Sequence, residues 1–198
     1  MAKVKEASAK YNAERRFTPD EYLAHEIFAE FKSEYYDGKI VAMAGASRDH
    51  NVIVGNTITA LNAALENKPC KVYPSDMRLQ LKRRQAYLYP DVMVVCGKPE
   101  FGSGRDDTVI NPIVIIEVLS ASTHNHDRVK KFALYKPIGS LQAYLMIDSE
   151  QVHVTYLQRE PNSRTWTIEM FDKLKDVVRL DFLDCMLPLR RIYNKVEL

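Results

Sequence analysis

Residues 111–120 read NPIVIIEVLS, and this stretch decides the fold. From Ile113 to Leu119 every residue except Glu117 is aliphatic, with none of the polar alternation of a strand that has one face in water. Such a run is typical of a strand that is covered on both faces. A carboxylate in this position leaves water at a cost of roughly several kcal/mol unless a partner or an ion compensates it. Glu117 is therefore the first candidate functional residue.

A second acid begins another apolar strand. Asp91 starts the run DVMVVC, residues 91–96. If this run pairs antiparallel with 113–119 through the polar loop 97–111, Asp91 and Glu117 become neighbours across the two strands. Their repulsion would raise a pKa or recruit a cation, and Mg²⁺ suits oxygen ligands. The pair predicts a Mg²⁺ site, with Mn²⁺ as a substitute. The alternative is that each acid makes an ordinary ion pair or turn hydrogen bond.

Capping residues and hydrophobic periodicity predict helices and strands along most of the chain. The expected elements, in order, are a helix beginning at Thr18, a hairpin over 34–43 that turns at Asp37-Gly38, a helix from Ser47 to about Glu66, strands 71–73, 77–81, 89–96 and 113–119, a helix over 126–136, and strands 142–147, 152–158 and 166–171, before a short apolar closing segment. This order predicts a mixed α/β or α+β fold with a central mixed β-sheet, flanking helices and additional antiparallel strands.

Length and composition fit one globular domain over residues 17–198, preceded by a flexible tail over 1–16. The chain has 198 residues, a 46% apolar share and a net charge of +2, which is too even to indicate nucleic-acid binding by itself. No apolar run is long enough to cross a membrane, and the N-terminus has no secretory leader pattern. The three cysteines are odd in number and form no CxxC pair, which disfavours a disulfide framework and favours a reducing cytoplasm.

Several motifs in the same order resemble the bacterial Uma family of restriction endonuclease-like proteins. They are EYYDGKIVAMAGAS (34–47), YPDVMVVC (89–96), NPIVIIEVLSAST (111–123), DRVKKFALY (127–135) and SLQAYLMID (140–148), and they lie within a match over about 17–195. The family belongs to the PD-(D/E)XK nuclease superfamily, so the resemblance implies a restriction-endonuclease-like fold and Mg²⁺-dependent hydrolysis of phosphodiester bonds. By this resemblance Asp91 and Glu117 are the metal-binding acids, Glu34 is an auxiliary acid, and His50 occupies a position where the family often has a histidine.

One position departs from the superfamily motif, which has a lysine two residues after the second acid. Here that position is Leu119, and the resemblance implies that Lys131, on the following helix, substitutes for it. Helical projection argues otherwise, because it places Lys131 opposite the apolar residues Val129, Phe132 and Ala133. The alternative is a solvated ion pair between Asp127 and Lys131, at i and i+4.

Other polar residues are weaker candidates. His50 lies on the inward stripe of its helix, so it is either a core histidine or a group of the site. Asp76 is read as a turn residue, and Ser120, Ser122 and Thr123 as the loop and cap of the next helix. The hairpin tip 82–85, which contains Lys82, Arg83 and Arg84, could contact a DNA backbone or simply be solvated.

Two functions follow from these residues. The first is a Mg²⁺-dependent DNA endonuclease, in which a homodimer would allow two sites to cut two strands; RNA or a repair intermediate is an alternative substrate. The second is a catalytically inactive binding module that keeps the nuclease fold, which the missing lysine at position 119 favours. The sequence shows neither a dimer interface nor a methyltransferase partner.

Overall fold

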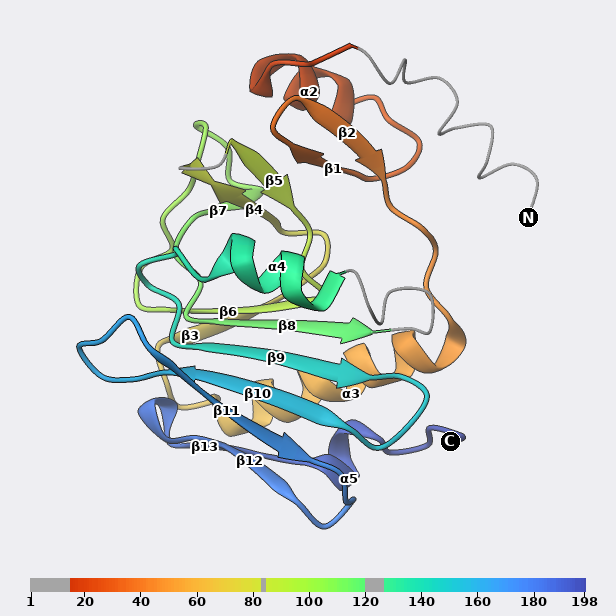
Figure 1. The fold of residues 1–198 in the computed structure, drawn as a ribbon, viewed down its shortest axis with the longest axis vertical. Helices are drawn as coiled ribbons and strands as arrows, with labels where there is room; N and C mark the ends of the chain where they lie inside the picture. Colours follow the sequence, from red (N-terminus) through yellow and green to blue (C-terminus); the bar gives the residue numbers. More distant parts are fainter. Residues whose placement is uncertain (1–14, 83–84, 120–126) are drawn as a thin grey trace.

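The structure is a computed structural model that describes residues 15–82, 85–119 and 127–198. At its centre lies a six-stranded mixed sheet in which β8 and β9 run parallel and the other neighbours antiparallel (Figure 1). In spatial order the strands are β11 (Trp166–Phe171), β10 (Val154–Arg159), β9 (Ala143–Asp148), β8 (Val114–Leu119), β6 (Val92–Cys96) and β3 (Cys70–Pro74). The predicted antiparallel pairing of the two most apolar strands is confirmed, since Val92 lies opposite Ile116.

Two helices cover opposite faces of this sheet, α3 (Arg48–Ala64) behind it and α4 (Asp127–Tyr135) in front (Figure 1). Ile53 and Leu61 of α3 pack in the same core cluster as Ile116. Tyr135 of α4 packs with Ile115 on the other face. As predicted, Ser47 caps α3, and its hydroxyl accepts the N–H of His50 at 3.2 Å. The predicted mixed sheet with flanking helices is therefore confirmed.

A second, five-stranded sheet stands above the first. Its strands, in spatial order, are β2 (Lys39–Ala42), β1 (Ser33–Tyr36), β5 (Ala86–Leu88), β4 (Arg78–Leu81) and β7 (Thr108–Val109). Helix α2 (Pro19–Glu26) begins at the predicted capping box of Thr18 and Glu21. Tyr22 of this helix packs on Tyr35 and Tyr87, with ring centroids 5.2 and 5.4 Å away, and so attaches α2 to the sheet.

Two predictions about this region were wrong. The strand expected over 89–96 begins only at Val92, because Tyr89-Pro90-Asp91 form the crossing from β5 in the second sheet to β6 in the central sheet. The polar loop 97–111 contains β7, which pairs parallel with β4. The apolar closing segment, residues 185–193, forms strand β13 (Cys185–Pro188) and the short helix α5 (Leu189–Ile192). Strand β13 pairs antiparallel with β12 (Val177–Leu180), and the 3₁₀ turn η2 (Asp181–Leu183) lies between the two strands.

The cysteine prediction was also wrong for one pair. Cys70 on β3 lies directly opposite Cys96 on β6, and the two form a disulfide with a Cα–Cα distance of 3.9 Å. Their spacing of 26 residues carries no motif, so only the pairing of β3 with β6 reveals the contact. The cysteines therefore no longer support a reducing compartment. Among the helices in the described ranges, none has the length and apolarity needed to span a bilayer.

The hairpin of β1 and β2 depends on backbone conformations that favour glycine. Asp37 and Gly38 form the predicted turn, with φ values of 42° and 86°. A Cβ added at Gly38 would also lie 3.1 Å from the Cβ of Arg16. The hairpin carries Glu34, so its geometry bears on the site described below.

We expect Gly38→Ala to lower the free energy of unfolding by about 1–2 kcal/mol, because a Cβ in the left-handed region is strained. Gly45→Ala is the matched control, since nothing lies within 4 Å of a Cβ added there and its φ is not in that region. Urea denaturation of both variants measures the difference. Equal stability of the two variants would contradict the strain at residue 38.

Candidate active site

Glu117 lies in the interior of the protein, on the face of β8 that α4 covers. Its exposed fraction is 3%. The register of β6 and β8 brings Asp91, which immediately precedes β6, beside it. One carboxylate oxygen of Asp91 accepts the backbone N–H of Val118 at 2.8 Å. The two acids named from the sequence are thus neighbours at the junction of two buried strands.

Helix α4 supplies a cation and a hydroxyl to the same carboxylate. Lys131 Nζ lies 3.1 Å from Glu117 Oε1, and the Tyr135 hydroxyl donates to that oxygen at 2.6 Å. The predicted solvent-facing side of this helix is therefore wrong, because Lys131 and the fully buried Tyr135 face the sheet while Ala133 is exposed. The side chain of Asp127, the alternative partner of Lys131, lies outside the described residues.

Glu34 reaches the same place from the second sheet. Its Oε1 lies 3.7 Å from Lys131 Nζ and accepts the backbone N–H of Tyr89 at 3.4 Å. Its other oxygen accepts a hydrogen bond from the hydroxyl of Tyr36. Lys131 therefore bridges Glu117 of the central sheet and Glu34 of the upper sheet.

His50 approaches Asp91 from the first turn of α3. Its Nε2 lies 3.2 Å from the same Asp91 oxygen that accepts the Val118 N–H. Its Nδ1 is buried and has no hydrogen-bond partner among the described residues. Burial of the imidazole would lower the pKa of His50, but the hydrogen bond to Asp91 and the negative charges of Asp91 and Glu117 together outweigh burial and raise the pKa. His50 and the Val118 N–H together fix the orientation of Asp91.

The cluster carries more negative than positive charge. Burial raises the pKa of Glu117 to about 7, and the neighbouring Asp91 and Glu34 add to this rise, against the opposing effect of Lys131. For Lys131, burial would lower the pKa of the ammonium, but Glu117 and Glu34 outweigh it and raise the pKa. Three carboxylates thus share one ammonium and one imidazole in a site with little access to water.

This donor set fits a hard divalent cation. Carboxylate oxygens are the ligands that Mg²⁺ prefers, and it commonly uses one or two of them together with water and substrate phosphate. Asp91 and Glu117 are the two adjacent carboxylates that could hold it. Within the described ranges, no group of three or more His, Cys, Asp or Glu residues is arranged as a complete metal-binding set. Of the described residues, such a site would use these two acids as its ligands.

Other residues singled out from the sequence lie elsewhere. Asp76 makes an exposed ion pair with Lys32 at 2.5 Å. Leu119, where the superfamily has its lysine, is buried in the core beneath α4. Ser120, Ser122, Thr123, Arg83 and Arg84 lie outside the described residues.

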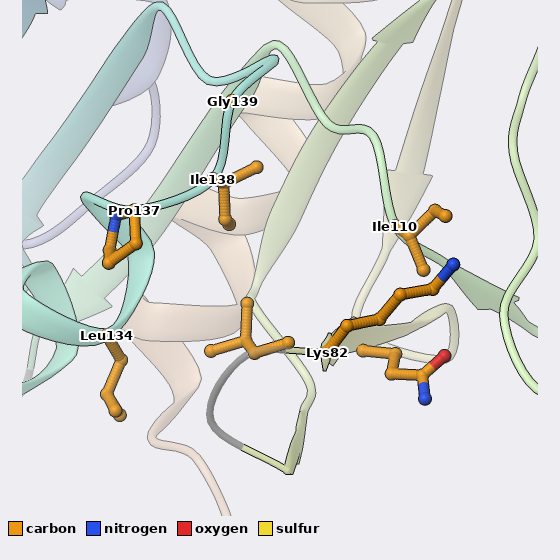
Figure 2. A pocket seen from close by; sticks show the side chains of 8 residues that line it. Lys82, Ile110, Leu134, Pro137, Ile138 and Gly139 are labelled. Carbon is orange, nitrogen blue, oxygen red and sulfur yellow. The ribbon is translucent and has the colours of Figure 1, made fainter.

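Lys82 is one of the residues that line a pocket, and that pocket contains none of the acidic cluster (Figure 2). The pocket opens between β4 and the connection from α4 to β9. It is lined by Gln80, Leu81, Lys82, Ile110, Leu134, Pro137, Ile138 and Gly139.

Two tyrosines of the acidic cluster were not predicted from the sequence to belong to the site. Helical projection places Tyr135 with Lys131 opposite the apolar residues, and Tyr36 is expected to pack on a strand face, yet each hydroxyl donates to a carboxylate of the site. Tyr135 lies one helical turn after Lys131, so the two side chains share a face of α4. That i, i+4 spacing is the one signal that could have assigned Tyr135 together with Lys131.

Three comparisons relate the chain to other proteins. The family model Uma2, described as "Putative restriction endonuclease", matches residues 19–189. Two proteins of Synechocystis sp., both described as uncharacterized, are similar in sequence. One, sll1609, is 38% identical over 151 residues, covering 76% of this chain and 85% of its own length. The other, slr1290, is 36% identical over 153 residues, covering 77% and 79%.

A solved structure shares the fold. It is described as a "putative nuclease belonging to DUF820" from Anabaena variabilis. The TM-score is 0.74 at 19% sequence identity, and the match covers 91% of this chain and 99% of that one. At this identity the likeness concerns the fold alone.

The raised pKa of Glu117 makes stability depend on pH. Its pKa of about 7 in the folded protein exceeds the ordinary glutamate pKa of 4.5, so the folded state binds the proton more tightly than the unfolded state. The contribution of Glu117 to the free energy of unfolding is therefore fully present below about pH 4.5 and is lost as the pH rises through about 7. We expect the free energy of unfolding of the wild type, relative to Glu117→Gln, to fall by about 1–3 kcal/mol between pH 5 and pH 8.

Urea denaturation at the two pH values measures this difference. Asp106→Asn, which alters an exposed carboxyl group, is the control and should show no such change. If the wild type instead became more stable than Glu117→Gln as the pH rises, Glu117 would be ionised at low cost. That result would refute the raised pKa of Glu117.

Proposed function

The chain belongs to the Uma2 family, and on that premise we propose that it is a Mg²⁺-dependent endonuclease that hydrolyses phosphodiester bonds of DNA. The family description is that of a restriction endonuclease, and the fold is that of a protein described as a nuclease. Metal dependence, DNA as substrate and the roles of individual residues are the parts that the proposal adds.

One observation carries the proposal. Lys131 Nζ lies 3.1 Å from Glu117 Oε1, beside Asp91, although Lys131 comes from a helix and not from the strand. Two metal-binding acids and a lysine are the side chains that the superfamily motif requires. The contact supports the proposal that Lys131 takes the place of the lysine that is missing at Leu119.

Each residue of the cluster has a physical task in such a reaction. Asp91 and Glu117 would provide carboxylate oxygens for the ion. Lys131 would direct its ammonium at the reacting phosphate or at the attacking water, where a fixed positive charge stabilises the developing negative charge. Tyr135 holds the Glu117 carboxylate by its hydroxyl, and His50 holds Asp91. These two are positioning residues, because neither is required to touch the substrate.

A bound Mg²⁺ would act as a Lewis acid at the phosphate and make water a stronger nucleophile near neutral pH. Without the ion, the carboxylates repel one another and the phosphate. The position of Glu34 suggests a further task, since it lies 3.7 Å from Lys131 Nζ and would keep the ammonium charged and oriented.

The alternative is an inactive binding module with the same fold. The feature in its favour is Leu119, which cannot act as the strand lysine. The contact between Lys131 and Glu117 weakens that argument, because it restores the same type of charge at the same carboxylate.

Cleavage of supercoiled plasmid DNA with Mg²⁺ or Mn²⁺ tests the catalytic assignment. We expect nicking or linearisation by the wild type and none in the presence of EDTA. Lys131→Met should reduce the rate by about 100-fold or more, the size of effect seen when a single charge-stabilising group is removed.

Lys130→Met is the matched control, because Lys130 is the exposed neighbour on the same helix. It should cleave at the wild-type rate. Absence of cleavage by the folded wild type on duplex DNA, single-stranded DNA and RNA would favour the inactive module. Equal loss of activity in both lysine variants would argue against a specific role of Lys131.

Metal binding can be tested without any cleavage. We expect Mg²⁺ or Mn²⁺ to raise the thermal midpoint of the wild type, since an ion present at about 100 times its Kd contributes about 2.7 kcal/mol to stability. Asp91→Asn and Glu117→Gln should each abolish the shift, whereas Asp106→Asn should keep it. Scanning calorimetry with and without the ion measures the effect, and a shift that survives both site variants would place the ion elsewhere.

A further inference from the structure

Strand β11 forms an open edge of the central sheet. It pairs with β10 on one side, and it is the first strand of the sheet order (Figure 1). Residues 166–171 are fully described, and no backbone hydrogen bond is found on their outer side. Four consecutive residues, 167–170, are exposed. An edge of this kind presents unpaired N–H and C=O groups to any partner strand.

The hydrogen-bond ladder determines which backbone groups point outward. Arg159 N–H donates to Gln142 and Asp148 N–H to the carbonyl of His153, so the odd-numbered residues of β10 pair with β9. The even-numbered residues of β10 therefore pair with β11, as the register of Tyr156 with Glu169 shows. The groups of Trp166, Ile168 and Met170 then point away from the sheet and are available to another strand.

The exposed side chains on one face of this edge are apolar, whereas Thr167 and Glu169 lie on the other face. Ile168 is 59% exposed and Met170 is 65% exposed, and the two lie on one face of β11. The strand, WTIEMF, has no proline, lysine or arginine, the residues that usually protect an open edge. At the opposite edge β3 carries both Lys71 and Pro74. Of the two edges of this sheet, β11 is the one built to accept a strand.

We propose that β11 pairs with β11 of a second copy of the chain, antiparallel about a two-fold axis at Ile168. Ile168 then lies opposite Ile168 of the other copy, and Trp166 lies opposite Met170. On the other face Thr167 lies opposite Glu169, so no two glutamates oppose each other. Every outward backbone group of Trp166, Ile168 and Met170 finds a partner. The strand is thus complementary to itself in backbone, apolar contact and charge.

This arrangement joins the two central sheets into one. Glu117, Met146, Thr155 and Met170 are lateral neighbours on one face of the sheet. Because the two-fold axis is perpendicular to the sheet, the two Glu117 side chains lie on the same side of the joined sheet. Seven strand spacings separate them, on the order of 35 Å for a flat sheet. The dimer itself does not rest on nuclease activity.

Sedimentation equilibrium of the full chain, without metal or DNA, tests the pairing. At micromolar concentration we expect twice the chain mass of 22.8 kDa. Ile168→Lys places two ammonium groups opposite each other at the axis and should give the monomer. Thr167→Lys adds the same charge to the same strand, but on the face where it meets Glu169 of the other copy, and should remain dimeric. A monomeric wild type, or a dimer that Ile168→Lys leaves intact, would overturn the proposal.

Cross-linking tests the register. In the proposed pairing, Ile168→Cys brings two thiols face to face at a hydrogen-bonded pair, where the Cα atoms lie about 5.5 Å apart, within disulfide range. Glu169→Cys, on the same exposed strand, faces Thr167 of the other copy instead of itself. We expect a covalent dimer of the first variant and little of the second under mild oxidation. Equal cross-linking of both variants, or none of Ile168→Cys, would refute this register.

Discussion

The burial of Glu117 within a sheet face is the constraint from which the site follows. An ionised carboxylate there loses roughly several kcal/mol of hydration, and its partners recover only part of it. Those partners come from α4, which delivers Lys131 and Tyr135 to one oxygen. The helix is therefore docked by polar contacts at its buried end as well as by Phe132, which stacks on Tyr144 with centroids 5.7 Å apart. Removing the acid would alter how α4 is held, not merely the charge of the site.

The sequence predicted the central sheet well because its strands are long, apolar and bounded by turn residues. The antiparallel pairing of β6 with β8 followed from the same pattern, and with it the meeting of Asp91 and Glu117. The second sheet was missed in part because its strand β5 has only three residues and lies directly before the crossing at Tyr89-Pro90-Asp91, where a strand of the central sheet was expected to begin. The disulfide was missed because the spacing of two cysteines does not reveal that their strands pair.

The orientation of α4 shows where pattern analysis fails for a physical reason. Helical projection assumes that apolar residues face inward, yet this helix turns Lys131 and Tyr135 toward the sheet and leaves Ala133 in water. The acidic cluster reverses the usual preference, because the ammonium of Lys131 gains more from Glu117 and Glu34 together than it loses by desolvation. Only the family resemblance pointed to Lys131. Moving the cation to a helix also leaves position 119 free for a leucine, which packs in the core beneath α4.

Trp166 is the chain's one tryptophan, and it touches the helix that carries Lys131. Its ring meets Phe132 edge-on, with centroids 5.2 Å apart, and the Arg159 guanidinium lies 4.9 Å from its centroid. The same residue begins the open edge strand. The indole therefore lies where α4 and the edge strand β11 meet. Its intrinsic fluorescence offers a label-free optical signal for any displacement of α4 and for any change in the solvent around β11.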